Sequence, residues 1–400
     1  MSTPEAIVLG GGINGLGAVR SLAQAGLHSI VVVKAGRDVA AVSRYSRRYT
    51  VSTFEGAAFV NELLNLRQEL SGPGILICAD DVALLTVSRF RDRLAPAFRF
   101  KLPQQQALCD LTLKEPFFRL AQDNGFPVPA TMLLRNRGDL GSLHDLRPPL
   151  CVKPNRRSKA YDGSFQKAYR VESHASALSL CERVLDAVGE VIVQEWIEGS
   201  NDAIYFSLCY MGEAPVAFTG QKGRSFPPQV GLTASCWAAS FAADELEDLT
   251  IRFFRSVGVT TGFASMEYKR DRRDGRFLMV EPTVGRVDGQ VEISALSGIN
   301  LCHVAYCDMA GLPGPQLKPD PAHVWRDEFR DLLSARMQGT ICRYPANYRV
   351  HNAYWRWDDP GPGLLESIGC ARGALYLAGK ASLRWLCVGS RTVLPVRVKV

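Results

Sequence analysis

The chain has 400 residues, which is enough for two or three domains with sizeable cores. Hydrophobic residues make up 46% and charged residues 22% of the sequence, proportions that are typical of a globular enzyme. The net charge of +7 favours an anionic ligand such as a nucleotide or an acidic metabolite, but the basic residues form only short clusters, so nucleic acid is not implied.

Cysteine usage and hydropathy indicate where the protein resides. The 11 cysteines are scattered without a Cys-x-x-Cys pair, which fits reduced thiols in a cytosol better than a disulfide framework. The first residues run directly into a strand and show no signal peptide. No apolar run reaches the roughly 18 residues that a membrane span needs. We therefore expect a cytoplasmic protein without a membrane span.

The first hundred residues predict a small open α/β domain with a parallel sheet. An apolar strand runs through a glycine-rich turn into a helix, and two further apolar segments are typical of buried strands. These elements are predicted at Ala6–Leu9, Gly10–Gly17, Ala18–Ala25, Ser29–Val33 and Ile75–Cys78.

The glycine-rich turn has two interpretations. Its pattern, glycine at 10, 12 and 15, matches the dinucleotide fingerprint, in which small residues let a phosphate approach a helix N-terminus. Such a site needs an acidic residue at the end of the second strand, and this chain has Lys34 and Arg37 there. Basic residues could accept the 2′-phosphate of NADP. The other interpretation is a tight strand-to-helix turn that binds no dinucleotide.

The middle of the chain alternates helices and strands and ends at a proline-rich boundary. A lysine closes one short strand, and a polar loop with a single glycine, Gly163, follows it. The last 80 or so residues are mixed α/β and carry no assignable motif. In chain order we expect helices at 107–114 and 117–122, strands at 150–153, 190–195 and 204–210, helices at 245–257 and 291–296, and the boundary at 312–321.

Two glutamates, Glu267 and Glu281, lie on a predicted β-hairpin. A three-residue loop at Arg273–Gly275 would pair Arg272 with Arg276, and the same register places the glutamates directly opposite each other. Their Cβ atoms would then be about 5 Å apart, and the carboxylates would repel unless a cation lay between them. Oxygen ligands suit a hard ion such as magnesium. A two-residue loop would separate the glutamates onto opposite faces, and a surface hairpin with solvated acids is the other interpretation.

From about residue 100 to 312, the order of these motifs resembles the ATP-grasp superfamily, and within it carboxylate–amine ligases of the D-aspartate-ligase-like type. The resemblance implies an α/β fold with α+β grasp subdomains. It divides the chain into a Rossmann-like domain with an open parallel sheet at 1–100, an ATP-grasp domain at 101–312 whose lid subdomain covers about 131–193, and a C-terminal extension at 313–400.

The resemblance also assigns a nucleotide site. It implies that three lysines contact the phosphates, with the third also acting in catalysis, and that a hinge holds adenine while an aspartate holds the ribose. In this sequence the lysines are Lys114, Lys153 and Lys222, with Arg224 as an alternative to the last; the hinge is Gln194, Glu195, Trp196 and Ile197; and the aspartate is Asp202. The loop at 155–167 takes the place of the phosphate-covering lid but has fewer glycines than the family pattern.

For the metal site, the resemblance implies that Glu267 is the first ligand and that Glu281 bridges two Mg²⁺ ions, which Mn²⁺ could replace. Thr283 stands where the family has asparagine, and its hydroxyl is a weaker neutral ligand. Arg286 is near the family's position for binding the substrate carboxylate or the acyl phosphate, a task that suits a guanidinium. The segment at 231–235 resembles the loop that lines the acceptor site.

The sequence therefore predicts an ATP- and Mg²⁺-dependent ligase that joins a small-molecule carboxylate to an amine through an acyl phosphate. No residue stands out as a required base. An NADP-dependent oxidoreductase that uses the glycine-rich turn is one alternative. A catalytically impaired nucleotide-binding relative is another, because of Thr283 and the glycine-poor lid. The sequence allows a homodimer.

Overall fold

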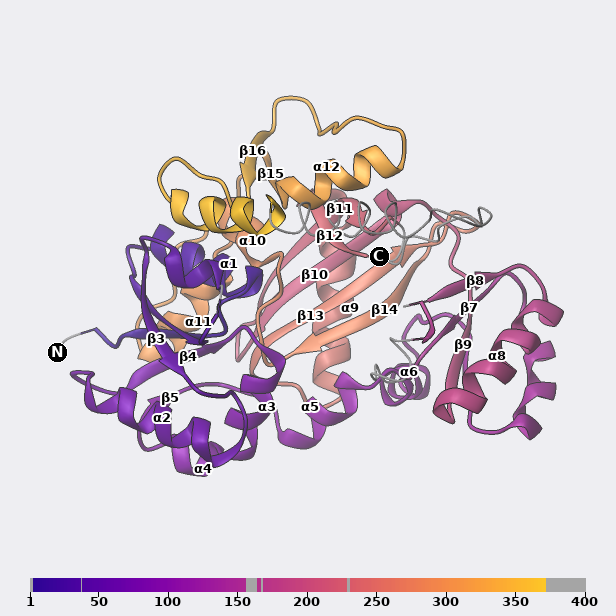
Figure 1. The fold of residues 1–400 in the computed structure, drawn as a ribbon, viewed down its shortest axis with the longest axis horizontal. Helices are drawn as coiled ribbons and strands as arrows, with labels where there is room; N and C mark the ends of the chain where they lie inside the picture. Colours follow the sequence, from indigo (N-terminus) through magenta and orange to yellow (C-terminus); the bar gives the residue numbers. More distant parts are fainter. Residues whose placement is uncertain (1–2, 37, 156–163, 167, 229–230, 372–400) are drawn as a thin grey trace, which may run out of the picture.

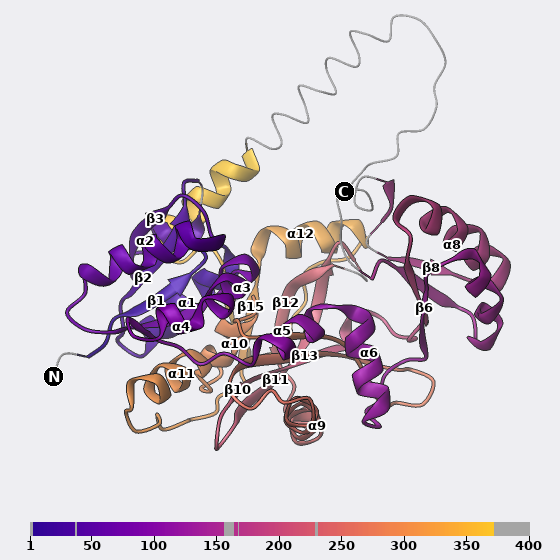
Figure 2. The same ribbon diagram turned by 90° about the horizontal axis from the view of Figure 1, so that it is seen from below.

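The computed structural model describes residues 3–36, 38–155, 164–166, 168–228 and 231–371. Within these ranges the strands form a five-stranded, a seven-stranded and a four-stranded sheet. Figures 1 and 2 show the five-stranded and the four-stranded sheets at opposite ends of the molecule, with the seven-stranded sheet between them. No helix in these ranges is long and apolar enough to cross a membrane.

The five-stranded sheet is parallel, with the strand order β3-β2-β1-β4-β5. Its central strands are apolar and almost completely buried, as the sequence predicts. The strands are β1 (Ala6–Leu9), β2 (Ser29–Lys34), β3 (Ser46–Val51), β4 (Gly74–Cys78) and β5 (Phe98–Arg99), and the helices are α1 (Ile13–Gln24), α2 (Gly56–Gln68), α3 (Asp81–Arg89) and α4 (Arg91–Leu94).

Helix α1 begins at Ile13, earlier than the predicted segment at Ala18–Ala25, because the glycine-rich turn is very tight. Gly10 has φ = +117°, and a Cβ atom on Gly15 would lie 2.0 Å from the Gly10 carbonyl oxygen. A Cβ atom on Gly11 would lie 2.5 Å from the side chain of Asp38. The packing of the turn thus explains Gly10, Gly11 and Gly15 without a dinucleotide, whereas a Cβ atom on Gly12 would meet nothing within 4 Å.

The four-stranded sheet, which we call the lid sheet, has the order β6-β9-β7-β8. Leu150, Val152 and Val193 point into a hydrophobic core that α8 completes, so the alternate residues Cys151 and Lys153 face the opposite side. The predicted phosphate-covering loop at 155–167 lies largely outside the described residues. The elements are β6 (Thr131–Leu134), η2 (Arg137–Asp145), β7 (Leu150–Lys153), β8 (Tyr169–Val171), α8 (His174–Val188) and β9 (Val191–Glu195).

The seven-stranded sheet has the order β14-β13-β10-β11-β12-β15-β16 and is antiparallel except for β15 and β16. It is preceded by α5 (Gln105–Thr112) and α6 (Lys114–Asp123), and the buried face of amphipathic α9 (Ala243–Ser256) packs on β10 and β11. The strands are β10 (Ile204–Met211), β11 (Val216–Phe226), β12 (Leu232–Ala238), β13 (Gly262–Arg270), β14 (Phe277–Val284), β15 (His323–Arg326) and β16 (Arg349–Asn352).

The hairpin of β13 and β14 corrects one prediction and confirms another. The predicted pairing of Arg272 with Arg276 is wrong, because the strands end at Arg270 and Phe277, which pair with each other. Residues 271–276 form a longer loop, in which Asp271 accepts a hydrogen bond from the Arg273 N–H at 2.9 Å. The side chain of Asp271 therefore stabilises a turn that the simple turn pattern did not predict.

A β-bulge restores the predicted glutamate pair. Next to the loop, Tyr268 pairs with Met279, so an unbroken ladder would pair Glu267 with Val280. The register shifts by one residue between Tyr268 and Glu267, and Glu267 consequently pairs with Glu281. The opposed glutamates are confirmed, although the bulge rather than the loop length places them.

The segment after residue 312 packs against both the seven-stranded sheet and helix α1 of the N-terminal part. Two of its strands extend the seven-stranded sheet, and α12 (Glu328–Met337) packs on β11 and β12. Arg20 of α1 forms a buried ion pair with Asp359 at 2.9 Å. A helix at 360–371 follows, and α10 (Val291–Leu296) and α11 (Leu301–Ala310) also pack against α1.

Candidate functional site

A cavity of about 430 Å³ lies between the lid sheet, the seven-stranded sheet and the N-terminus of α1. It brings together every predicted site residue except Asp202 and the alternative Arg224. The predicted residues that line it are Lys114, Lys153, Gln194, Glu195, Trp196, Ile197, Lys222, Glu267, Glu281, Thr283 and Arg286.

Three lysines reach this cavity from three different elements. Lys114 is the first residue of α6, Lys153 is the last residue of β7, and Lys222 lies in the middle of β11. Lys153 is only 8% exposed, and its Nζ donates to Gln194 Oε1 at 3.0 Å and lies 4.8 Å from the centre of the Phe118 ring. A buried ammonium at a strand end is a fixed positive charge that can neutralise a phosphate.

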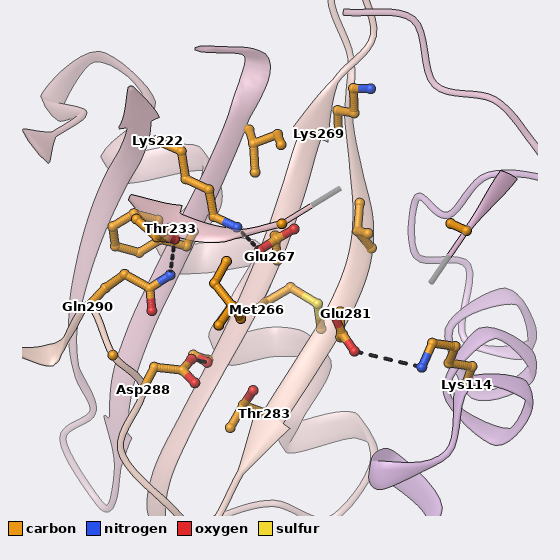
Figure 3. Close-up of a pocket in the computed structure, with 18 of the residues that line it drawn as sticks. Lys114, Lys222, Thr233, Met266, Glu267, Lys269, Glu281, Thr283, Asp288 and Gln290 are labelled. Atoms are coloured by element: carbon orange, nitrogen blue, oxygen red, sulfur yellow. Dashed lines mark hydrogen bonds and ion pairs between the residues drawn. The ribbon is translucent and has the colours of Figure 1, made fainter. Parts of the chain in front are cut away.

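The opposed glutamates are each accompanied by one of these lysines. Lys222 forms an ion pair with Glu267, and Lys114 Nζ lies 3.8 Å from Glu281 Oε1 (Figure 3). Thr283 lies two residues beyond Glu281 and pairs with Ser265 of β13. The two carboxylates can therefore lie close together because cations compensate their charge. An oxygen-donor set of two carboxylates and a hydroxyl fits a hard divalent ion.

The hinge after β9 leaves one residue with its backbone groups available. The N–H of Glu195 donates to the Ala130 carbonyl at 2.9 Å, and the N–H of Trp196 donates to the Pro149 carbonyl at 2.9 Å. Within the described ranges, neither backbone group of Ile197 has a hydrogen-bond partner. The side chain of Gln194 accepts from Lys153 and donates to Thr131 Oγ1 at 2.8 Å. A base bound here would therefore pair with Ile197.

Asp202 does not line the cavity. It lies in the short 3₁₀ helix η3 (Asn201–Ala203), where its exposed carboxylate accepts a hydrogen bond from the Ser200 hydroxyl. Its backbone carbonyl accepts a hydrogen bond from the side chain of Gln221 at 2.5 Å. Its contact with a ribose stays a prediction.

Arg286 lies where β14 leaves the sheet and is held by two carboxylates. Its Nε is bonded to Asp81 at 2.5 Å and its Nη1 to Asp288 at 3.0 Å. Burial opposes the charge on Arg286, but the two aspartates outweigh it and raise the pKa of the guanidinium above its ordinary value. Within the described residues Nη2 has no partner, so one end of a rigid fork is available to an anion. Arg224, in contrast, is paired with buried Asp331 at 2.6 Å and lies outside the cavity lining.

Comparison with family models gives no match. Among curated proteins, a D-aspartate ligase from Enterococcus faecium (strain Aus0004) is 23% identical over 315 residues, which cover 74% of each chain. Among solved structures, the N5-carboxyaminoimidazole synthetase from Staphylococcus aureus has a TM-score of 0.60 at 12% identity, covering 79% of this chain and 81% of that one. An L-amino acid ligase from Bacillus licheniformis has a TM-score of 0.59 at 15% identity, covering 81% and 79%.

The chain has the fold of these ATP-grasp ligases. The mixed α/β class with a parallel first sheet, which the sequence predicts, is confirmed by these structural neighbours.

The ATP-grasp cavity also contains residues that the sequence analysis missed. Ser265 and Lys269 share a face of β13 with Glu267, so the two-residue period of a strand could have identified them. Asp288 follows β14 in a loop, and the sequence pattern gave no signal for it. Its carboxylate accepts hydrogen bonds from Ser265 and Arg286, and it lines the cavity beside Thr283 (Figure 3).

The end of the ATP-grasp cavity away from the hinge is built by segments that are far apart in sequence. Asn14 comes from α1, Thr233 from β12, Trp325 from β15 and Arg330 from α12. Thr233 accepts a hydrogen bond at 2.6 Å from Gln290, which precedes α10. We call this part of the cavity the acceptor end. It carries both signs of charge, since Arg330 and Asp288 line it.

Proposed function

We propose that this protein is an ATP- and Mg²⁺-dependent carboxylate–amine ligase that forms an amide through an acyl phosphate. The observation that carries the proposal is the convergence of three lysines and the opposed glutamates on one cavity of an ATP-grasp fold. Solved neighbours of the same fold include an N5-carboxyaminoimidazole synthetase complexed with ADP and a carboxyaminoimidazole ribonucleotide synthase complexed with ATP. These support a nucleotide in this cavity.

The residues present fit magnesium. Mg²⁺ is commonly bound by one or two carboxylates together with substrate phosphates and water, rather than by an all-protein cage. In the described part of the chain, no group of three or more histidine, cysteine or acidic side chains forms such a cage, whereas Glu267 and Glu281 are directly opposed. These two glutamates would hold the ion or ions, and Thr283 would contribute a neutral oxygen. Bound there, magnesium neutralises charge on the triphosphate.

The chain's own cations complete the phosphate site. Lys222 and Lys114, which here pair with the two glutamates, would turn their ammonium groups to phosphate oxygens if the glutamates held Mg²⁺. Lys153 adds a buried charge beside the hinge. Phosphoryl transfer depends largely on this positioning and neutralisation. The γ-phosphoryl group passes to an oxygen of the substrate carboxylate, which yields ADP and an acyl phosphate.

The second step takes place at the acceptor end. The amine attacks the acyl carbon, the C–O bond to phosphate breaks, and an amide and inorganic phosphate result. Arg286 has a free Nη2 with which to hold the acyl phosphate, and Asp288, next to it, can bind the ammonium of the amine and accept a proton from it. The names of the D-aspartate ligase and the L-amino acid ligase support amino acids as the substrate class.

ADP release from ATP and Mg²⁺, measured with pools of L- and D-amino acids, tests this function. Glu281→Gln should lower Mg²⁺-dependent ADP release by about a hundredfold or more, because a metal ligand supports several kcal/mol of charge stabilisation. The control is Glu213→Gln, which alters an exposed glutamate outside the cavity lining. If Glu281→Gln turned over like the wild type, Glu281 would not be a metal ligand. If no amino acid pool stimulated ADP release, the proposed substrate class would be wrong.

A further inference from the structure

One amine in the cavity lacks a hydrogen-bond acceptor. Lys269 lines the cavity from β13, where it shares a face with Glu267. In the described ranges its Nζ makes no hydrogen bond or ion pair, and it lies 4.6 Å from the centre of the Trp196 ring. A half-buried amine of this kind loses hydration without gaining an acceptor, and a bound ligand can supply one.

The neighbours of Lys269 place this amine at the hinge end of the cavity. A Cβ atom on Gly199 would lie 3.6 Å from Lys269 Cε, so the side chain runs along the segment that follows the hinge. The ammonium of Lys269 also interacts electrostatically with the thiol of Cys151, on the facing strand β7 of the lid sheet. Lys269 therefore lies between the two sheets, close to Trp196, the hinge residue that precedes Ile197.

One face of β13 thus divides the cavity into three parts. Ser265, bonded to Asp288, belongs to the acceptor end, and Glu267, paired with Lys222, belongs to the phosphate site. Lys269 is two residues further towards the hinge, roughly 7 Å along the strand. If the triphosphate lies at the phosphate site, as in the proposed function, this third part of the cavity holds the nucleotide base.

A lysine amine at the edge of a purine discriminates between bases. Guanine presents two acceptors, O6 and N7, on one edge, whereas adenine presents N7 beside a 6-amino group, which is a donor. The unpartnered N–H and carbonyl of Ile197 can pair with either purine, because each base offers both a donor and an acceptor. The hinge alone therefore does not exclude guanine, and the amine of Lys269 favours it.

We propose that Lys269 donates hydrogen bonds to the O6/N7 edge of guanine, and that the chain uses GTP as a phosphoryl donor in addition to ATP. The inference rests on the proposed function, since it requires a purine triphosphate in this cavity. The inference adds a preference between purine bases. The three phosphate lysines do not determine this preference, because they contact no base atom in the proposed function.

Equilibrium binding of non-hydrolysable analogues tests the inference without requiring turnover. Titration calorimetry with Mg²⁺ would compare the guanosine and adenosine imidotriphosphates on the wild type, Lys269→Met and Lys269→Arg. We expect the wild type to bind the guanosine analogue within about tenfold of the adenosine analogue, and Lys269→Met to weaken only the guanosine analogue by roughly tenfold or more. Lys269→Arg retains donors and should keep guanosine binding, and Lys318→Met is a control at an exposed lysine.

If Lys269→Met does not fold, the wild type alone can still test the inference with a modified guanine base. The wild type should bind 7-deaza-GTP, which lacks the N7 acceptor, more weakly than GTP. The inference is overturned if the guanosine analogue binds the wild type more than about tenfold more weakly than the adenosine analogue, or if Lys269→Met weakens both equally. Binding of the adenosine analogue alone leaves the proposed function intact, whereas binding of neither analogue removes the proposed function as well.

Discussion

Replacing Lys153 by methionine removes a buried cation from the proposed phosphate site while keeping an unbranched chain of similar length. Lys153 is 8% exposed, and the contacts of its ammonium include Gln194 Oε1 at 3.0 Å and the face of the Phe118 ring at 4.8 Å. When ATP binds, the ammonium gains a charge-assisted hydrogen bond to phosphate, which contributes about 1.5–3 kcal/mol. At about 1.4 kcal/mol per factor of ten, ATP affinity should fall roughly tenfold to a hundredfold.

The assay is equilibrium binding of ATP with Mg²⁺, together with the KM for ATP where turnover can be measured. Methionine can keep the contact with Phe118, so the melting temperature should change little. The matched control is Lys34→Met, because Lys34 also closes a strand and also lies over a phenylalanine ring, yet it is exposed and outside the cavity. Unchanged ATP affinity in Lys153→Met, or an equal loss in Lys34→Met, would refute the assignment of Lys153 to the phosphates.

Three further changes test stability and metal binding. Asp359→Ala leaves buried Arg20 without its counter-charge and should lower the free energy of unfolding by about 3–5 kcal/mol in urea titrations, whereas Asp358→Ala, at an exposed neighbour, should cost under about 1 kcal/mol. Burial raises the pKa of Asp327 from 3.8 to about 6. Between these two pH values the folded state holds a proton that the unfolded state has lost. The free energy of unfolding should therefore fall by up to about 3 kcal/mol as the pH rises from 4 to 6. Asp327→Asn should flatten that profile, and an unchanged slope would contradict the assignment. Thr283→Asn restores an amide oxygen beside Glu281 and should lower the Mg²⁺ concentration that gives half-maximal ADP release, while an increase would exclude Thr283 from the metal site.

The buried strands and the residues at their ends were predictable because short-range patterns determine them. An unbroken apolar run predicts a parallel strand such as β4, and a lysine directly after such a run, as in Lys153, predicts a charge at the edge of a sheet. Lys114, at the start of a helix, and Lys222, in the middle of a strand, have no such pattern and were predicted from the resemblance to the ATP-grasp superfamily. What the patterns could not predict was the exact ladder between β13 and β14. There a hydrogen bond from the Arg273 N–H to the side chain of Asp271 and a bulge beside Glu267 decide the register.

The acceptor end could not be predicted, because its residues meet only in the folded chain. Asn14 and Arg330 are separated by more than 300 residues of sequence, yet they line the same cavity. Neither has a local motif: one lies in the first turn of a helix after a glycine-rich turn, and the other lies near the start of α12. The sequence pattern left two interpretations of the glycine-rich turn open, and neither predicted that the turn brings the start of α1 to the wall of the cavity.

The segment after residue 312 is part of the site rather than an appendage. Trp325 and Arg330 line the cavity, and the position of α12 is set by the buried pair of Asp331 with Arg224 at 2.6 Å. Arg224 lies two residues from Lys222 on β11, so one strand holds both the proposed phosphate lysine and the anchor of α12. A shift of α12 would therefore strain the strand that positions Lys222. In the proposed function, this geometry couples the acceptor end, where the substrates would bind, to the phosphate site, where one of them would be activated.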